Sequence, residues 1–215
     1  MLFSSMDVNQ LAGRLGDCCY GFLTLNFLWG LYCVILIWRR ISALRFRDEK
    51  AQSEFLETIE QHLEANDFEG AKRLCREDTR ALPQLALVVL ENADLSEKQL
   101  RQLVAELMQR NVLADLEYRI SWVATVIKSG PLLGLFGTVL GMMAAFGRMG
   151  SGEKPDPKVI ASDISIALIC TAMGLTTAIP FNFILSNLKI RVGILQDYLT
   201  SGMTKFLEHF KNIRR

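Results

Sequence analysis

Three long runs of hydrophobic residues separate apolar from charged parts of the chain. The first run covers residues 20–38 and contains no charged residue. The second covers residues 119–147, where Lys128 is the only charged residue after Arg119, and the third covers residues 164–188 without a charge. A helix rises about 1.5 Å per residue, so about 20 apolar residues cross a hydrocarbon core of roughly 30 Å. The pattern therefore predicts three transmembrane helices.

The charges that flank these runs predict their orientation. Residues 1–19 hold one Arg and two Asp, whereas four arginines follow the first run with no acid among them. These are Arg39, Arg40, Arg45 and Arg47. Excess Lys and Arg marks the cytoplasmic side of a membrane protein. We therefore expect segments 1–19 and 148–163 outside the cell, and segments 39–118 and 189–215 in the cytoplasm.

The charged segment between the first two runs has a helical pattern. Phe55, Ile59 and Leu63 recur every four positions, as on one face of an amphipathic helix. Asn66 and the aspartate after it are expected to end this helix, and Pro83 is expected to begin the next. This segment is therefore predicted to be a domain of helices only.

A further helix is predicted to begin at the end of this segment. Ser96 is followed by Gln99 at the spacing of a capping box. No helix breaker lies between Glu97 and about Lys128, so this helix is expected to continue into the second span. The expected fold is all-α, with three transmembrane helices and long helices that extend into a cytoplasmic helical domain.

Composition limits the chemistry that this chain can perform. Half of the residues are hydrophobic, and the mean hydropathy is +0.22 although 22% of residues are charged. The formal net charge of +1 predicts no nucleic-acid partner. The five cysteines lack metal-ligand spacing, and the only histidines, His62 and His209, lie among charged residues. We therefore expect no metal, no cofactor and no enzyme activity.

Small residues form a stripe on each of the last two spans. The second span carries Gly130, Gly134, Gly137 and Gly141, and the third carries Gly174 and Ala178 after Ala167 and Thr171. Each glycine weakens a helix by about 1 kcal/mol relative to alanine, so a stripe of four needs a reason. In lipid that reason is close approach of helix backbones. The approach can join neighbouring chains or only helices within one chain.

Two threonines stand near the middle of these spans. Thr138 and Thr171 lie beside the small-residue stripes, at similar depth in the membrane. A hydroxyl in a membrane helix can bond a carbonyl of its own helix, which gives it no special role. Two hydroxyls at matching depth can instead line a narrow path for water. Both readings stay open from the pattern alone.

Three further residues stand out in the second and third spans. Pro131 and Pro180 are expected to kink their helices, because proline removes a backbone hydrogen bond. Lys128 lies ten residues before Thr138, about 15 Å toward the cytoplasmic side. Its ammonium group can reach the lipid headgroups or act as a charged gate at the inner mouth of a channel.

Two motifs carry a resemblance to a known family. The stretch GPLLGLFGTVLGM at residues 130–142 closely resembles the signature of the MotA/TolQ/ExbB proton channel family. The stretch IALICTAMGL at residues 166–175, with AIP at 178–180, resembles the family's signature in its last span. The resemblance covers roughly residues 20–200. The three-span plan is more similar to the ExbB/TolQ branch than to MotA.

The resemblance implies a function and partners. It implies a homo-pentamer in a bacterial inner membrane, with the outer segments periplasmic, around two copies of a single-span ExbD/TolR-like protein. An aspartate of that partner would carry the proton, and Thr138 and Thr171 match the family's pore threonines. The complex would convert proton-motive force into mechanical work. Ile166 stands where ExbB-like members often carry a glutamate, so the alternative is a non-conducting scaffold that anchors the partner.

Overall fold

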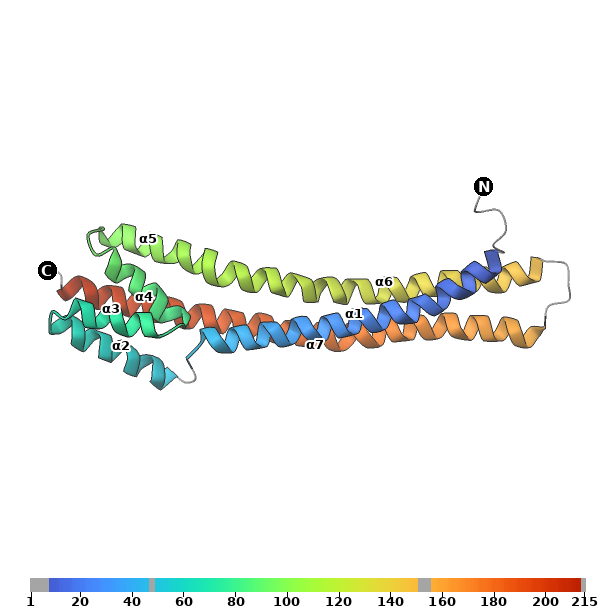
Figure 1. The fold of residues 1–215 in the computed structure, drawn as a ribbon, viewed down its shortest axis with the longest axis horizontal. Helices are drawn as coiled ribbons and strands as arrows, with labels where there is room; N and C mark the ends of the chain where they lie inside the picture. Colours follow the sequence, from blue (N-terminus) through green and yellow to red (C-terminus); the bar gives the residue numbers. More distant parts are fainter. Residues whose placement is uncertain (1–7, 47–48, 151–155, 214–215) are drawn as a thin grey trace. The chain divides into compact units, whose positions relative to one another are not determined.

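The computed structural model describes residues 8–46, 49–150 and 156–213. Helices account for nearly all of these residues, and no strand occurs among them (Figure 1). The prediction of an all-α fold is therefore confirmed. In chain order the elements are α1 Val8–Leu44, α2 Glu49–Glu64, α3 Phe68–Glu77, α4 Ala81–Glu91, α5 Glu97–Leu107, the π-helical η1 Met108–Leu113, α6 Ala114–Gly150 and α7 Pro157–Ile213.

Three helical segments are long and apolar enough to cross a membrane. They are Cys18–Leu44, Glu97–Gly147 and Pro157–Ile213. Each contains one of the hydrophobic runs of the sequence, which confirms the prediction of three membrane-spanning helices. The exact ends of each span stay predictions.

The described residues form two compact units. The first, called the membrane unit, comprises the described parts of Met1–Val34 and Ser121–Ser186. The second, called the helical-domain unit, comprises those of Ile35–Ile120 and Asn187–Arg215.

The membrane unit consists of parts of α1, α6 and α7 that lie side by side (Figure 1). Large apolar side chains remain exposed on all three helices, including Leu25, Leu132 and Phe183, of which Phe183 is 70% exposed. Such exposure is stable in lipid, where an apolar side chain loses nothing by facing acyl chains. Its buried positions hold small residues such as Ala145 and Cys170 together with larger ones such as Leu23 and Phe181.

The helical-domain unit has a core of aliphatic and aromatic side chains. Ile59 and Leu63 of α2 are fully buried, as is Phe206 of α7. Cys75 of α3 is also fully buried, and this burial raises the pKa of its thiol to about 12. The helical period seen in the sequence therefore marks the face that α2 buries, as expected.

The turn after α2 lies where the sequence predicts it. Asn66 has a φ of 57°, in the left-handed region where asparagine is one of the few tolerated residues. The Asp67 side chain then accepts a hydrogen bond of 2.9 Å from the backbone N–H of Gly70 and caps α3. The start of α4 differs from the prediction, because the helix begins at Ala81 and Pro83 lies at its third position.

The capping box at the start of α5 is present as predicted. The Ser96 hydroxyl accepts from the backbone N–H of Gln99, and the Gln99 side chain accepts from the backbone N–H of Ser96. The helix then continues without a break through η1 into α6, which agrees with the predicted continuous helix. The π-helical turn inside it was not predicted, and such turns recur at functional sites.

Candidate functional site

The backbones of α6 and α7 come into close contact at two glycines of the membrane unit. A Cβ atom added to Gly174 would lie 2.6 Å from the carbonyl oxygen of Gly130. A Cβ added to Gly130 would lie 3.2 Å from the carbonyl oxygen of Gly174. Non-bonded carbon atoms normally stay about 3.5–4.0 Å apart. The two backbones therefore lie in direct contact: a Cβ at position 174 would overlap the α6 backbone, and one at position 130 would be tight.

The next two glycines of α6 meet the same surface of α7. A Cβ on Gly134 would lie 2.9 Å from the carbonyl oxygen of Cys170 and 2.9 Å from the Cα of Thr171. A Cβ on Gly137 would lie 2.8 Å from the Cβ of Cys170. The buried Cys170 side chain thus occupies the space that Gly137 leaves open.

The contact continues to the last glycine of the stripe. A Cβ on Gly141 would lie 2.6 Å from the Cβ of Ala167. Ala178, at the other end of the stripe on α7, is also buried. The two stripes therefore meet inside one chain, which is the second alternative that the sequence left open. We call this contact the glycine seam, and it comprises Gly130, Gly134, Gly137 and Gly141 of α6 with Ala167, Cys170, Thr171 and Gly174 of α7.

Thr171 joins the two helices of the seam by a hydrogen bond. Its hydroxyl donates to the carbonyl oxygen of Gly134, 37 residues away in sequence, over 3.1 Å. Thr176 and Thr177 of the same helix instead donate to carbonyls four residues back. Thr171 therefore differs from an ordinary membrane threonine, because its hydroxyl is directed across the seam.

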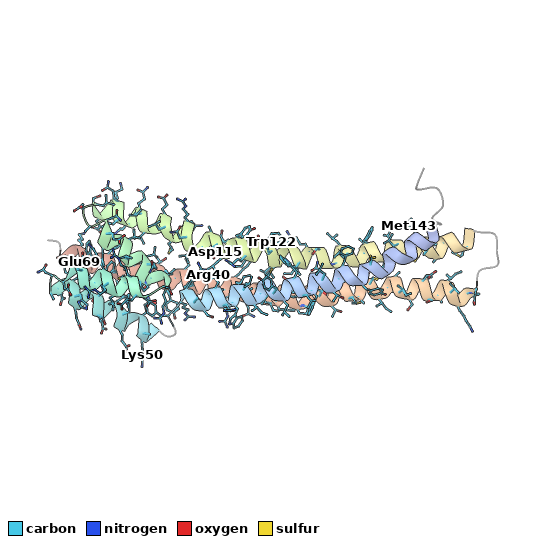
Figure 2. All side chains as sticks on the ribbon, in the orientation of Figure 1. Arg40, Lys50, Glu69, Asp115, Trp122 and Met143 are labelled. Atoms are coloured by element: carbon cyan, nitrogen blue, oxygen red, sulfur yellow. The ribbon has the colours of Figure 1, made fainter. Side chains whose placement is uncertain are left out.

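Thr138 has a different environment. Its hydroxyl donates over 2.7 Å to the carbonyl oxygen of Leu135 in its own helix. It lines a shallow hollow of about 490 Å³ together with apolar side chains of α6, among them Met143 and Phe146. Phe146 is 60% exposed, and Met143 projects from the ribbon (Figure 2). The hydroxyl of Thr171 thus lies in the seam, whereas Thr138 lies on an open face of α6.

The other predicted residues take up simpler positions. Pro131 and Pro180 both lie inside continuous helices, α6 and α7, and a kink at either one stays a prediction. Lys128 is exposed and forms no ion pair with any residue that the structure describes. This exposure is compatible with both of its proposed roles, contact with headgroups and gating.

A polar contact between α1 and α6 was missed in the sequence. The Asn26 side-chain amide donates a hydrogen bond of 2.5 Å to the hydroxyl of Ser129, which itself donates over 3.2 Å to the carbonyl of Val126. The side-chain oxygen of Asn26 is buried without a hydrogen-bond partner. The available signal was an asparagine inside a charge-free run, because such residues often bond a neighbouring helix.

A second hydrogen bond joins α1 to α7. The Tyr20 hydroxyl donates over 3.1 Å to the carbonyl oxygen of Ile166. Within the described residues, no group of three or more His, Cys, Asp or Glu side chains is arranged to hold a metal ion. The membrane unit therefore offers hydroxyl and amide groups between its helices, and the hydrophobic runs of α6 and α7 past Lys128 carry no charge.

Comparison with known proteins gives one family match. Residues 69–200 match the model of the MotA/TolQ/ExbB proton channel family. This range contains the whole glycine seam and both threonines, together with α3 to η1 of the helical-domain unit.

Individual relatives agree with this match. The chain is 37% identical over 102 residues to the Tol-Pal system protein TolQ of Haemophilus influenzae, an alignment covering 47% of this chain and 42% of the relative. It is 39% identical over 83 residues to the putative biopolymer transport protein ExbB-like 2 of Helicobacter pylori, in an alignment that covers 39% of this chain and 55% of the relative. It is 32% identical over 142 residues to the biopolymer transport protein ExbB of Pseudomonas putida, in an alignment that covers 63% of this chain and 41% of the relative. The chain thus spans about half the length of these curated relatives.

Proposed function

Because this chain belongs to the MotA/TolQ/ExbB proton channel family, we propose that it is the channel and stator subunit of a proton-driven motor. The motor lies in the inner membrane of a bacterium and converts proton-motive force into mechanical work across the envelope. The relatives named TolQ and ExbB support the ExbB/TolQ-like branch.

The observation that carries this proposal is the hydrogen bond from Thr171 to Gly134 across the glycine seam. A hydroxyl held between two charge-free spans can order water or bond the protonated carboxyl group of a partner. It cannot carry a proton alone, because its O–H group does not ionise near neutral pH. The lack of any acid in residues 129–147 and 164–188 therefore favours a partner that supplies the carboxylate.

We propose that five copies of this chain surround two copies of a single-span ExbD/TolR-like protein. The open face of α6 that carries Thr138 supports this arrangement, because the described residues leave its apolar side chains largely exposed. A helix from a partner or from a neighbouring copy would cover this face. The two threonines then contribute differently: Thr138 contacts the entering helix, and the Thr171 oxygen accepts a hydrogen bond from water or from the partner's carboxyl group while its O–H donates to Gly134.

The proposed orientation places the N-terminus in the periplasm and the C-terminus in the cytoplasm. It rests on the arginines that follow the first span. Reporter fusions at Ser96 and Ser151 test it, because Ser96 is expected to report a cytoplasmic position and Ser151 a periplasmic one. A cytoplasmic signal at Ser151 would overturn this orientation.

Proton flux into liposomes tests the conducting function. We expect the chain alone to conduct little, and flux to appear when the single-span partner is co-reconstituted. Thr171→Val removes the hydroxyl but keeps the shape of the side chain, so the complex should assemble while partner-dependent flux falls. Thr176→Val is the matched control, because its hydroxyl only bonds the carbonyl of Ala172 in its own helix. Full flux in Thr171→Val would refute the proposed role.

The alternative function is a non-conducting scaffold that anchors the same partner. The observation in its favour is Ile166, an apolar residue where ExbB-like relatives are expected to carry a glutamate. The two functions differ in one measurement. A scaffold would assemble with the partner, resist dissociation and yet show no flux above that of empty liposomes.

A further inference from the structure

The helical-domain unit contains a large cavity that the proposed function does not use. Its volume is about 900 Å³, and it lies where α1 ends, beside α3, the start of α4 and part of α7. Its apolar lining includes Ile41, Phe46 and Phe55, and three arginines, Arg45, Arg80 and Arg191, add positive charge. Ligand-binding pockets typically measure about 300–1,000 Å³, so the cavity can hold a small organic molecule.

Two of these arginines are held in place by aromatic rings instead of carboxylates. The guanidinium group of Arg45 lies 4.6 Å from the ring centre of Tyr198, and that of Arg191 lies 4.2 Å from the ring centre of Trp38. A guanidinium group stacked on a ring presents its N–H donors at the edge, where they can grip a phosphate with two hydrogen bonds. The rings thus orient both donors without neutralising them.

Two other arginines of the helical-domain unit lie outside the cavity lining and share one carboxylate. Arg40 of α1, labelled in Figure 2, pairs with Asp115 of α6 over 3.2 Å. Arg119 contacts the same carboxylate over 3.0 Å. By contrast, neither Arg45 nor Arg191 has a carboxylate within ion-pair distance among the described residues. These two are the cations that remain available for a ligand.

The acidic residues of the cavity do not cancel this charge. Asp78 pairs with Arg80 over 3.5 Å and also accepts a hydrogen bond from its backbone N–H over 2.9 Å. Glu77 is exposed and has no described partner. With Arg45 and Arg191, the lining carries three positive and two negative charges. A ligand with one negative charge would therefore balance it.

The position of the cavity along α1 indicates where such a ligand would come from. Trp38 ends the charge-free run, and aromatic residues of this kind mark the membrane interface. Ile41 and Arg45 follow three and seven residues later, about 4 and 10 Å along the chain. The cavity thus begins at the depth of lipid headgroups, and its lining is apolar as well as cationic.

We propose that this cavity binds the headgroup of an anionic phospholipid, with its phosphate on Arg45 and Arg191 and its upper acyl carbons against Ile41 and Phe46. A single phosphodiester supplies the one negative charge that the lining lacks. A free phosphate compound offers the same anionic oxygens but gains nothing from the apolar lining. The site does not depend on conduction, because it requires only that α1 leaves the membrane near Trp38.

Native mass spectrometry of the full chain in an uncharged detergent tests this proposal. The probes are dioctanoyl-phosphatidylglycerol, which is anionic, and dioctanoyl-phosphatidylcholine, which is zwitterionic with the same acyl chains. We expect the ratio of bound to free protein to be about tenfold higher with the anionic lipid, a difference of about 1.4 kcal/mol. Both lipids offer the same phosphodiester, but the choline cation of the zwitterionic lipid is repelled by the positive charge of the lining. Equal binding of the two lipids would overturn the proposal.

Substitutions locate the binding site within the chain. Arg45→Gln and Arg191→Gln should each reduce binding of dioctanoyl-phosphatidylglycerol by about tenfold, because each removes a charge-assisted hydrogen bond to the phosphate. Lys50→Gln is the control, because this exposed lysine of α2 also loses one positive charge but does not line the cavity (Figure 2). If Arg45→Gln lowers the helix content in circular dichroism, the test rests on Arg191→Gln alone, because Arg191 is exposed. A loss in Lys50→Gln equal to that in Arg191→Gln would reduce the effect to general charge attraction and refute the site.

A third probe separates the two sources of a phosphate group. Inorganic phosphate added at the same concentration as the anionic lipid should not displace it, because phosphate cannot use the apolar lining. Displacement by phosphate would assign the cavity to a free phosphate compound and refute the lipid.

Discussion

Replacement of Gly174 by alanine tests whether the glycine seam is a true backbone contact. The new Cβ would lie 2.6 Å from the carbonyl oxygen of Gly130 and 3.3 Å from the Cα of Pro131. The carbonyl oxygen belongs to the α6 backbone and cannot rotate away as a side chain can. The two helices must therefore separate locally, and the contacts on either side of Gly174 must loosen with them.

The expected magnitude follows from the missing space. An ordinary contact begins at 3.4 Å, so the new Cβ falls about 0.8 Å short of it. Overpacking of this kind costs about 1–3 kcal/mol. The better helix propensity of alanine offsets at most about 1 kcal/mol of this cost. We therefore expect Gly174→Ala to lower the free energy of unfolding by about 1–2 kcal/mol, and Gly130→Ala, at 3.2 Å, to lower it less.

Gly21→Ala is the matched control in the same unit. Among the described residues, a Cβ at Gly21 meets nothing within 4 Å, so only the helix propensity changes. This variant should be as stable as the parent or more stable by up to about 1 kcal/mol. The assay is unfolding in mixed detergent micelles by increasing SDS, followed by circular dichroism. Gly174→Ala as stable as Gly21→Ala would refute the backbone contact.

Three other changes test separate parts of the structure. Burial raises the pKa of Cys75 to about 12, so a maleimide at neutral pH should label the exposed Cys18 and leave Cys75 unlabelled until the chain unfolds. Fast labelling of Cys75 in the folded protein would contradict its burial. Ser96→Ala removes the N-cap of α5 and should lower the free energy of unfolding by about 1 kcal/mol, whereas Ser96→Asp should not, and equal loss in both would rule out capping. Asn26→Leu removes the hydrogen bond to Ser129, and unfolding in SDS should show a loss near 0.6 kcal/mol, the average for such bonds in a membrane; a loss above about 2 kcal/mol would mean that Asn26 has another role.

Much of the fold could be predicted because its signals are local. A run of residues without charge is sufficient to indicate a span, since lipid excludes unpaired charges. The capping box at Ser96 and the helix end at Asn66 likewise depend on a few neighbouring residues. The start of α4 was wrong by two residues, because proline is accepted anywhere in the first turn of a helix and so marks its beginning only approximately.

The candidate site was less predictable because its contacts join distant residues. The sequence shows that Gly134 and Thr171 each lie on a small-residue stripe, but not that the stripes face each other. The hydrogen bond between them joins residues 37 positions apart, so no local sequence pattern predicts it. The contact of Arg191 with the Trp38 ring was also not predictable. In the sequence these two residues lie at the ends of different spans, and nothing indicates that they meet. The π-helical turn η1 has no comparable sequence signal.

The glycine seam also limits how copies of this chain can associate. The close contacts at Gly130 and Gly174 are already made within one chain, so the same surfaces cannot also receive a neighbour. Any ring must therefore use faces that the seam leaves open, and on α6 such a face carries Thr138, Met143 and Phe146. The seam would then act as a rigid wall that keeps Thr171 fixed, while the open face adapts to the helix that it contacts. In the proposed motor this division lets a partner move against α6 without separation of α6 from α7.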